Sequence, residues 1–248
     1  MEVADGLKTF RKKIMFLEMS LIYVIILLAL TGSGRGTATP ESLEVSGIYR
    51  DSEDGEKPDP YQDEKKKVAL TFDDGPDAVY TPKLLDGLEE RKVKATFFLL
   101  GKQAERYPDI VKRIHEEGHL VGTHSYEHVN LCTVSEKEAI RQVLKTNELI
   151  QELTDEYPQY IRPPYGCWSR KLDNKIGMIE VDWDIDPLDW NRSNSRVIAK
   201  LVTDKVQEGD IILMHDASDS SVKAAFQIID TLKKQGYEFV TVEAIVGE

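Results

Sequence analysis

The sequence contains little cysteine, and positive residues are in the minority among its charges. Two cysteines among 248 residues, Cys132 and Cys167, are too few for a disulfide-stabilised scaffold or a cysteine-based zinc site. The 32 lysines and arginines against 44 acidic residues give a net charge of −12, which argues against non-specific binding to nucleic acid. With 41% hydrophobic and 31% charged residues, the composition is that of a globular protein with room for one large core.

A hydrophobic run near the amino terminus follows a positively charged flank. Four lysines or arginines precede an apolar stretch over residues 14–30, which is slightly short of the ~20 residues that a spanning helix needs. Residues 1–31 are therefore expected to be a signal peptide or an uncleaved signal anchor, and the pattern leaves both open. In either case the positive flank stays in the cytoplasm and the remainder is extracytoplasmic, tied to the membrane if the segment is uncleaved.

Residues 32–66 have a different composition. They are rich in glycine, serine, proline and acidic residues and show no apolar periodicity. This predicts an acidic flexible linker, followed by one folded domain over residues 67–248.

From residue 67 onward, short apolar segments alternate with amphipathic ones. Strands are expected at 68–72, 95–100, 119–123, 160–162, 179–183, 210–215 and 238–242, and helices at 81–91, 104–117, 135–153, 195–206 and 220–234. Such alternation predicts an α/β fold, with a parallel sheet covered by helices. Because no glycine-rich phosphate loop follows the first strand, we expect a βα barrel of about seven parallel strands rather than a nucleotide-binding open sheet.

Two adjacent carboxylates, Asp73 and Asp74, end the first apolar strand, and Gly75-Pro76 prevents the strand from continuing. Adjacent acids repel each other unless a cation or separate hydrogen-bonding partners keep them ionised. The pair therefore indicates a metal site with a general base, while a strand followed by an ordinary Asp-Gly turn is the alternative.

His124 and His128 are four residues apart, which puts two imidazoles on one face if the stretch is a helical turn. Two histidines and one aspartate suit zinc and leave a position open for water. A chance pair of surface histidines is the alternative, and the two acids upstream make it the weaker one.

A second histidine pair matches a metal-binding pattern but is not expected to bind a metal. His115-Glu116-Glu117-Gly118-His119 matches the H-E-x-x-H pattern of zinc proteases, which requires both histidines on one continuous helix face. We expect Gly118 to end the helix and His119 to begin a strand, so that the two imidazoles diverge.

Three later strands also end in polar residues, and the carboxyl ends of barrel strands meet at one rim. Arg162 beside a carboxylate would keep it ionised and oriented, although the prolines that follow also fit an extended connector. Asp189 beside an essential histidine would fix its tautomer and raise its pKa, although it also fits a solvated loop. His215 fits either such a site or the interior of the core.

Together and in order, these motifs resemble those of the polysaccharide deacetylases of carbohydrate esterase family 4. The motifs are Thr71-Phe72-Asp73-Asp74-Gly75-Pro76, His124-Ser125-x-x-His128, Arg162-Pro163-Pro164-Tyr165, Trp183 with Asp186-x-x-Asp189-Trp190, and Leu213-x-His215. The resemblance runs from about residue 67 to the carboxyl terminus. It implies a distorted (β/α) barrel that removes acetyl groups from polysaccharides with a divalent metal, zinc or cobalt.

The resemblance also implies a role for each matching residue. Asp74, His124 and His128 would bind the metal. Asp73 would be the general base, held by Arg162.

On the other side of the site, His215 would be the general acid, tuned by Asp189. Tyr165 would offer its backbone N–H to the oxyanion, and Trp183 and Leu213 would line the acetyl pocket. Asp186 receives no role from the resemblance.

With the export segment, the resemblance implies removal of N-acetyl groups from N-acetylglucosamine-containing polysaccharide, peptidoglycan above all. Deacetylation of chitooligosaccharide or acetyl-xylan stays open because the motifs do not specify the sugar. A catalytically silent, membrane-tethered glycan-binding protein is the alternative from another class. Cys132 and Cys167 follow the second and third motifs closely, so an exported protein could join them in a disulfide or keep two free thiols.

Overall fold

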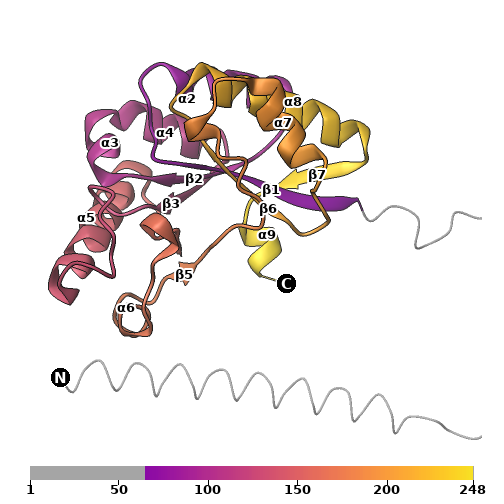
Figure 1. Ribbon diagram of the computed structural model, residues 1–248. Helices are drawn as coiled ribbons and strands as arrows, with labels where there is room; N and C mark the ends of the chain where they lie inside the picture. Colours follow the sequence, from indigo (N-terminus) through magenta and orange to yellow (C-terminus); the bar gives the residue numbers. More distant parts are fainter. Residues whose placement is uncertain (1–64, 248) are drawn as a thin grey trace, which may run out of the picture. The chain divides into compact units, whose positions relative to one another are not determined.

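The computed structural model describes residues 65–247 of the chain (Figure 1). The predicted signal peptide or anchor over residues 1–31 and nearly all of the predicted linker lie outside the described residues. Within residues 65–247 no helix is both long and apolar enough to cross a membrane. The membrane segment therefore stays a prediction from the sequence.

Seven strands of the described residues form one sheet in which every pairing is parallel, as predicted. The strands are β1 Lys66–Asp73, β2 Thr96–Leu99, β3 Leu120–Thr123, β4 Tyr160–Ile161, β5 Ile179–Glu180, β6 Ile211–His215 and β7 Tyr237–Val240. Their order is β5-β4-β3-β2-β1-β6, and β7 pairs with the first half of β1. The central strand β1 therefore bonds to three others, which fixes the position of its last residue, Asp73.

The sheet is a half-barrel, more open than the predicted barrel. Its two edges, β5 and β6, are connected by an irregular segment in which Ile185 makes an isolated bridge to Ile212. The strand predicted over 179–183 is correspondingly only two residues long. Acidic residues are depleted in strands and proline cannot donate to a ladder, so the sequence Asp182-x-Asp184-x-Asp186-Pro187 does not sustain a regular edge.

Helices flank the sheet, most of them on its outer side and the last one on its inner face (Figure 1). They are α2 Tyr80–Glu90, α3 Gly101–Arg106, α4 Pro108–Glu116, α5 Glu136–Thr154, α6 Arg170–Ile176, α7 Ser195–Thr203, α8 Asp219–Lys234 and α9 Glu243–Val246, with 3-10 turns η1 Pro164–Gly166 and η2 Asp189–Asn191. The single helix predicted over 104–117 is wrong. Pro108 disfavours a helical Tyr107 before it and begins α4 as its first residue, so α3 and α4 are separate.

Side chains of β1 alternate between two environments, because successive residues of a strand point to opposite faces of the sheet. Val68, Leu70 and Phe72 belong to the main core beneath α2, α4, α7 and α8. Ala69 belongs to a smaller cluster on the opposite, inner face. Thr71 and Asp73 share that inner face with Ala69 and are 0% and 3% exposed, so polar groups enter the interior of the half-barrel.

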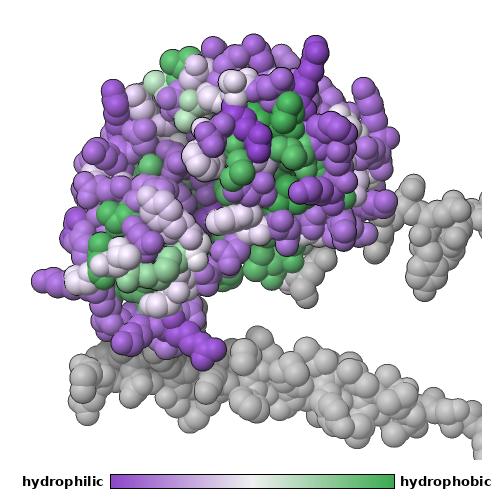
Figure 2. Space-filling view, in the orientation of Figure 1, coloured by the Kyte–Doolittle hydropathy of each residue, from purple (hydrophilic) through white to green (hydrophobic). Residues whose placement is uncertain are grey.

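The outside of this domain is mostly hydrophilic, with small apolar groups scattered over the face shown in Figure 2. Among the exposed large hydrophobic side chains, Tyr165 and Trp190 are 68% and 65% exposed. Both follow strands of the sheet at their carboxyl ends, where the predicted site residues also lie.

Candidate active site at the carboxyl ends of the strands

Strand pairing brings the first and last predicted motifs together. Asp73 is the register partner of His215 on β6 and of Phe98 on β2. His124 follows the last residue of β3, and Arg162 follows the last residue of β4. Residues from four segments distant in the sequence therefore meet at one rim, as expected for a parallel sheet.

Asp74, His124 and His128 form the one group of potential metal ligands found among the described residues, with ligand atoms within 4.8 Å of one another. Asp74 Oδ1 lies 3.5 Å from Nε2 of His124 and 3.5 Å from Nε2 of His128. Asp74 and His128 both have left-handed backbone conformations, with φ of 72° and 57°. The helical turn considered for the two histidines is absent, and the left-handed backbone aims the rings at Asp74 instead.

The donor atoms of this group fit a cation. His124 Nδ1 lies 2.6 Å from the carbonyl oxygen of Arg162, which only accepts, so Nδ1 carries the proton. Burial lowers the pKa of His124, which keeps the ring neutral, with the lone pair of Nε2 facing Asp74. Asp74 Oδ1 is buried and has no hydrogen-bond partner among the described residues. Two acceptors facing each other without a proton between them suit a shared metal ion.

Asp73 forms a buried ion pair with Arg162. Arg162 Nη1 donates to Asp73 Oδ1 at 2.9 Å and to Thr71 Oγ1 at 2.6 Å. Its Nε and Nη2 donate to the carbonyl oxygens of Val181 and Asp182 at 3.0 and 2.9 Å. Because all three guanidinium nitrogens donate hydrogen bonds and the side chain is 0% exposed, the guanidinium is held rigidly and its charge offsets that of Asp73.

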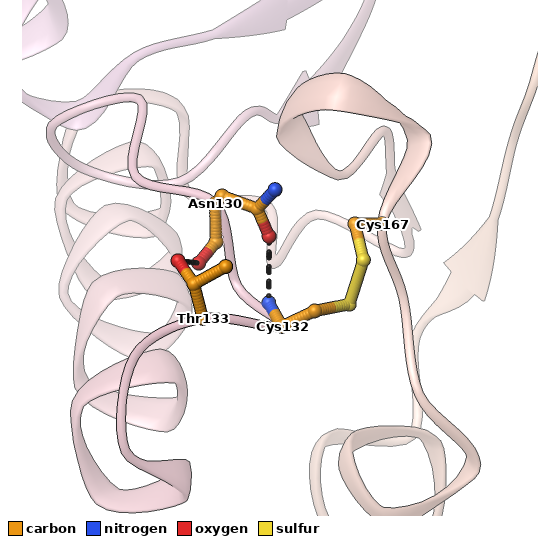
Figure 3. The surroundings of a disulfide bond; sticks show 4 residues. All are labelled: Asn130, Cys132, Thr133 and Cys167. Carbon is orange, nitrogen blue, oxygen red and sulfur yellow. Dashed lines mark hydrogen bonds between the residues drawn. A yellow bond between two sulfur atoms is a disulfide. The ribbon is translucent and has the colours of Figure 1, made fainter.

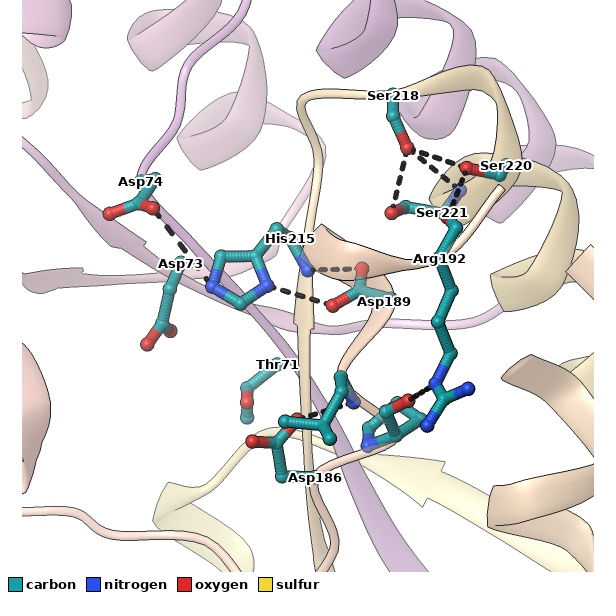
Figure 4. A network of polar contacts seen from close by, with 12 residues as sticks. Thr71, Asp73, Asp74, Asp186, Asp189, Arg192, His215, Ser218, Ser220 and Ser221 are labelled. Carbon is teal, nitrogen blue, oxygen red and sulfur yellow. Dashed lines mark hydrogen bonds and ion pairs between the residues drawn. The ribbon is translucent and has the colours of Figure 1, made fainter. Parts of the chain in front are cut away.

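His215 is held by Asp189 on the other side of the rim (Figure 4). Asp189 Oδ1 lies 2.8 Å from His215 Nδ1, and Oδ2 accepts from the His215 backbone N–H at 2.9 Å. Burial by itself lowers the pKa of His215, but the hydrogen bond and charge of Asp189, with the charges of Asp73 and Asp74, raise it to about 9. The opposite ring atom, Nε2, lies 3.9 Å from Asp74 Oδ2, so His215 faces the group of potential ligands.

The remaining predicted site residues lie around this centre. Tyr165 has φ of 62°, and its ring meets that of His128 edge-on at 4.8 Å. The ring of Trp183 lies 5.8 Å from the guanidinium carbon of Arg162. Leu213 is 5% exposed on β6, two residues before His215 and on the same face of that strand.

Asp186, which received no role in the site from the sequence, has a local structural one. Its Oδ1 accepts from the backbone N–H of Leu188 at 2.7 Å, which shapes the turn before η2. It is Asp189, three residues later, that bonds to His215, as Figure 4 shows.

Two polar residues of the site were missed from the sequence. Thr71 bridges Arg162 to the carbonyl oxygen of Ile212, and alternation along β1 would have placed it on the face of Asp73. Asp216 is 0% exposed, and burial raises the pKa of its carboxyl to about 7 although a hydrogen bond from Thr81 lowers it. The position of Asp216 directly after His215 was the one feature of the sequence that could have placed it near the site.

The predicted failure of the H-E-x-x-H pattern is confirmed. Helix α4 ends at Glu116, Gly118 has φ of 74°, and β3 begins at Leu120. His119 Nδ1 accepts from the Ala95 backbone N–H at 3.1 Å, so its proton is on Nε2 and neither nitrogen is free for a metal.

Cys132 and Cys167 form a disulfide, with Cα atoms 5.9 Å apart (Figure 3). The hypothesis that they approach each other is confirmed. The bond connects the segment that follows His128 to the segment that follows Tyr165.

Comparison with known proteins agrees with this geometry. A family model described as polysaccharide deacetylase matches residues 61–181. A peptidoglycan-N-acetylglucosamine deacetylase of Bacillus cereus is 41% identical over 221 residues, covering 85% of this chain and 76% of the relative. The solved structure of the peptidoglycan deacetylase PdaC from Bacillus subtilis matches with a TM-score of 0.72 at 39% identity, covering 74% of this chain and 91% of that one.

Some relatives are much longer than the matched region. The peptidoglycan-N-acetylglucosamine deacetylase PgdA of Listeria monocytogenes is 41% identical over 183 residues, which are 74% of this chain and 39% of the relative. The matched part of this chain therefore spans well under half of that relative's length.

Proposed function

Because the chain belongs to the polysaccharide deacetylase family, we propose that it is a metal-dependent hydrolase that removes N-acetyl groups from N-acetylglucosamine-containing polysaccharide, with peptidoglycan as the substrate. One observation carries the proposal. A three-ligand group lies between a carboxylate offset by a buried arginine and an imidazole whose pKa is raised to about 9. A base and an acid on either side of a Lewis-acid site are what hydrolysis of an acetamide requires.

The proposed metal ligands are Asp74, His124 and His128, and zinc is the proposed ion, with cobalt as the alternative. One carboxylate and two imidazoles leave a position open on a four-coordinate zinc ion. A divalent cation held there supplies Lewis acidity, which polarises an acetyl carbonyl and makes water more acidic.

Asp73 is the proposed general base. Arg162 holds one carboxylate oxygen at 2.9 Å, while the other lies 3.9 Å from His124 Nε2 and faces the ligand group. Asp73 takes the proton of the attacking water, and Arg162 keeps the carboxylate aimed during the transfer.

His215 is the proposed general acid. With a pKa of about 9 its imidazole is protonated at neutral pH, and Asp189 fixes the ring so that Nε2 faces the site. His215 donates that proton to the departing amine, and acetate and a glucosamine unit leave.

Three further residues are proposed to bind the acetyl group. The backbone N–H of Tyr165 donates to the oxyanion, a role supported by its strained position beside His128. Trp183 and Leu213 form the apolar wall of the acetyl pocket. Leu213 shares a strand face with His215, which supports its part in that wall.

We propose that the reaction takes place outside the cytoplasm. The positively charged flank and apolar run of residues 1–31 would export the chain, residues 32–66 would act as an acidic tether, and residues 67–248 would form the catalytic domain. The peptidoglycan deacetylases among the relatives support the wall as the substrate.

Acetate release from purified peptidoglycan, from chitooligosaccharides and from acetyl-xylan by the full-length chain tests the proposal. We expect acetate release from peptidoglycan in the presence of zinc or cobalt, and loss of this release with a chelator. Mass spectrometry of the products should show glucosamine units in place of N-acetylglucosamine. Acetate release from another glycan but not from peptidoglycan would show that the proposed substrate is wrong. No release from any acetylated glycan, with glycan binding unaffected by chelator, would support a silent glycan-binding protein instead.

Two variants test the division of roles between the adjacent acids. Asp73→Asn and Asp74→Asn should both reduce turnover by about 10²–10⁴-fold, because each removes a group that acts in the reaction. Only Asp74→Asn should also weaken zinc binding strongly, measured by calorimetric titration. Equal loss of zinc from both variants would contradict the division.

A further inference from the structure

Asp216 is a buried acid for which the proposed chemistry has no use. Its side chain is 0% exposed. The Thr81 hydroxyl donates a hydrogen bond to Oδ2, while Oδ1 has no hydrogen-bond partner within the described residues. Burying an acid without a paired cation is unfavourable, so a position that only filled the core would be better served by an apolar residue.

The Asp216 carboxyl occupies the space beside Gly75, in the turn that carries Asp74. A Cβ atom added to Gly75 would lie 2.5 Å from Asp216 Oδ2 and 2.7 Å from Oδ1. The carboxyl therefore touches the backbone of the turn directly. The Gly75 carbonyl oxygen accepts from the Leu100 backbone N–H at 3.1 Å, which anchors the turn to the end of β2 as well.

Thr81 extends the contact to the other end of the turn. Its hydroxyl oxygen accepts from the Asp77 backbone N–H at 2.7 Å and donates to Asp216. The Asp77 carboxylate in turn accepts from the backbone N–H groups of Val79 and Tyr80 at 2.7 and 2.8 Å, at the start of α2. Residues 75–77 thus meet Asp216 through a packing contact at one end and a hydroxyl bridge at the other.

Asp74, the proposed metal ligand, precedes Gly75, and His215, the proposed general acid, precedes Asp216. Asp74 has a left-handed backbone with φ of 72°, which a residue other than glycine keeps only where its surroundings hold it. His215 precedes Asp216 directly in the chain, and Ser218 two residues later caps α8. Figure 4 shows His215 and Ser218 each fixed by its own hydrogen bonds, so the segment that carries Asp216 is anchored on both sides.

We infer that Asp216 is a positioning residue, which buttresses the turn at Gly75 and thereby holds Asp74 in place opposite His215. Asp74 Oδ2 and His215 Nε2 are 3.9 Å apart. Asp216 is bonded to His215 as its neighbour in the chain, and it packs against Gly75, the residue that follows Asp74. This inference rests on the proposed function, since it gives Asp74 the role of a metal ligand. It concerns shape and hydrogen bonding, not proton transfer by Asp216.

Cobalt(II) titration of the metal-free full-length chain, followed by visible absorbance, tests the inference without reference to turnover. Asp216→Ala should weaken cobalt affinity about 10-fold to 100-fold and alter the absorbance spectrum, because the support of a ligand is removed. Asp216→Asn keeps the shape and can still accept from Thr81, so its affinity should stay within about threefold of the parent chain. Val202→Ala, which truncates an equally buried residue of α7, controls for general loss of stability.

Each outcome of this titration is decisive. Cobalt binding by Asp216→Ala with the affinity and spectrum of the parent chain would overturn the inference, as would an equal loss in Val202→Ala. If Asp216→Ala does not fold, Thr81→Val takes its place, and unchanged affinity in that variant would overturn the inference. Absence of cobalt binding by the parent chain would refute the proposed metal site itself, which separates the two failures.

Discussion

Two buried histidines lie at opposite ends of the same parallel sheet, and their surroundings give them opposite properties. His119, before β3, is 4% exposed, and burial with the charges of Lys94 and Arg113 lowers its pKa to about 4. His215, at the end of β6, is also mostly buried, yet its pKa is raised to about 9.

The distance to a carboxylate accounts for the difference. Asp189 lies 2.8 Å from His215 Nδ1, within hydrogen-bonding range, whereas the Glu117 carboxylate lies 3.9 Å from His119 Nε2 and is not bonded to it. Burial alone favours the neutral ring, and an aligned carboxylate reverses this preference. At neutral pH His215 is therefore protonated and His119 is neutral, so of these two histidines only His215 carries a proton that it could donate as an imidazolium.

The largest expected effect comes from removing the carboxylate that distinguishes the two histidines. Asp189→Asn should let burial dominate, lower the pKa of His215 and reduce kcat by about 10²–10⁴-fold at neutral pH. The basic limb of the pH–rate profile should move to lower pH than in the parent chain, because the hydrogen bond and charge of Asp189 raise the pKa of His215. Asp186→Asn is the matched control, because that exposed residue binds only the N–H of Leu188, and its profile should be unchanged.

A second expected effect is on stability at alkaline pH. The folded pKa of His215 lies above the unfolded value of about 6.5, so its contribution is complete below pH 6.5 and is lost as pH rises through 9. The loss should be about 3 kcal/mol in the metal-free protein, measured by urea unfolding between pH 6.5 and pH 9.5. The same slope in Asp189→Asn would show that the carboxylate is not the cause.

His119 should give a slope of the opposite sign at acid pH. Its folded pKa of about 4 is below the unfolded value, so the unfolded chain binds the extra proton and stability falls as pH drops from 6.5 towards 4. His119→Asn can still accept from the Ala95 N–H and should reduce this loss by about 3 kcal/mol. His115→Asn, at a histidine that is 30% exposed, is the control and should leave the acid limb unchanged.

The smallest expected effect isolates the role of a nearby positive charge. Lys94→Gln should raise the pKa of His119, followed by NMR titration, because one of the charges that disfavour protonation is removed. The increase should shrink in high salt, since Lys94 is exposed and its field is screened. An unchanged pKa would leave burial and Arg113 as the whole cause.

Local signals in the sequence predicted most of the strands and the residues that gather at the rim. Asp73, His124 and His215 each follow an apolar run, and parallel strands bring such ends together without any further information. Pro108 is also a local signal, and the prediction of one helix over 104–117 is wrong because that proline separates α3 from α4.

The features that the sequence did not predict depend on contacts between distant residues. Arg162 reaches Thr71 across 91 positions, and Asp216 reaches Thr81 across 135. The opening of the barrel depends likewise on whether the segment around Ile185 can pair with β6. No periodicity or spacing encodes such contacts, so only the folded chain reveals them.

The disulfide between Cys132 and Cys167 changes how far apart two parts of the site are along the covalent network. His124 and Arg162, which share a hydrogen bond, are 38 residues apart in the chain. Through the disulfide the path is 8 residues from His124 to Cys132 and 5 from Arg162 to Cys167, which makes 13 residues. Loop-closure entropy grows with the logarithm of length, so this shortcut lowers the cost of bringing the two together by about 1 kcal/mol. His124 and Arg162 therefore come together at the lowest entropic cost in a compartment that keeps the two thiols oxidised.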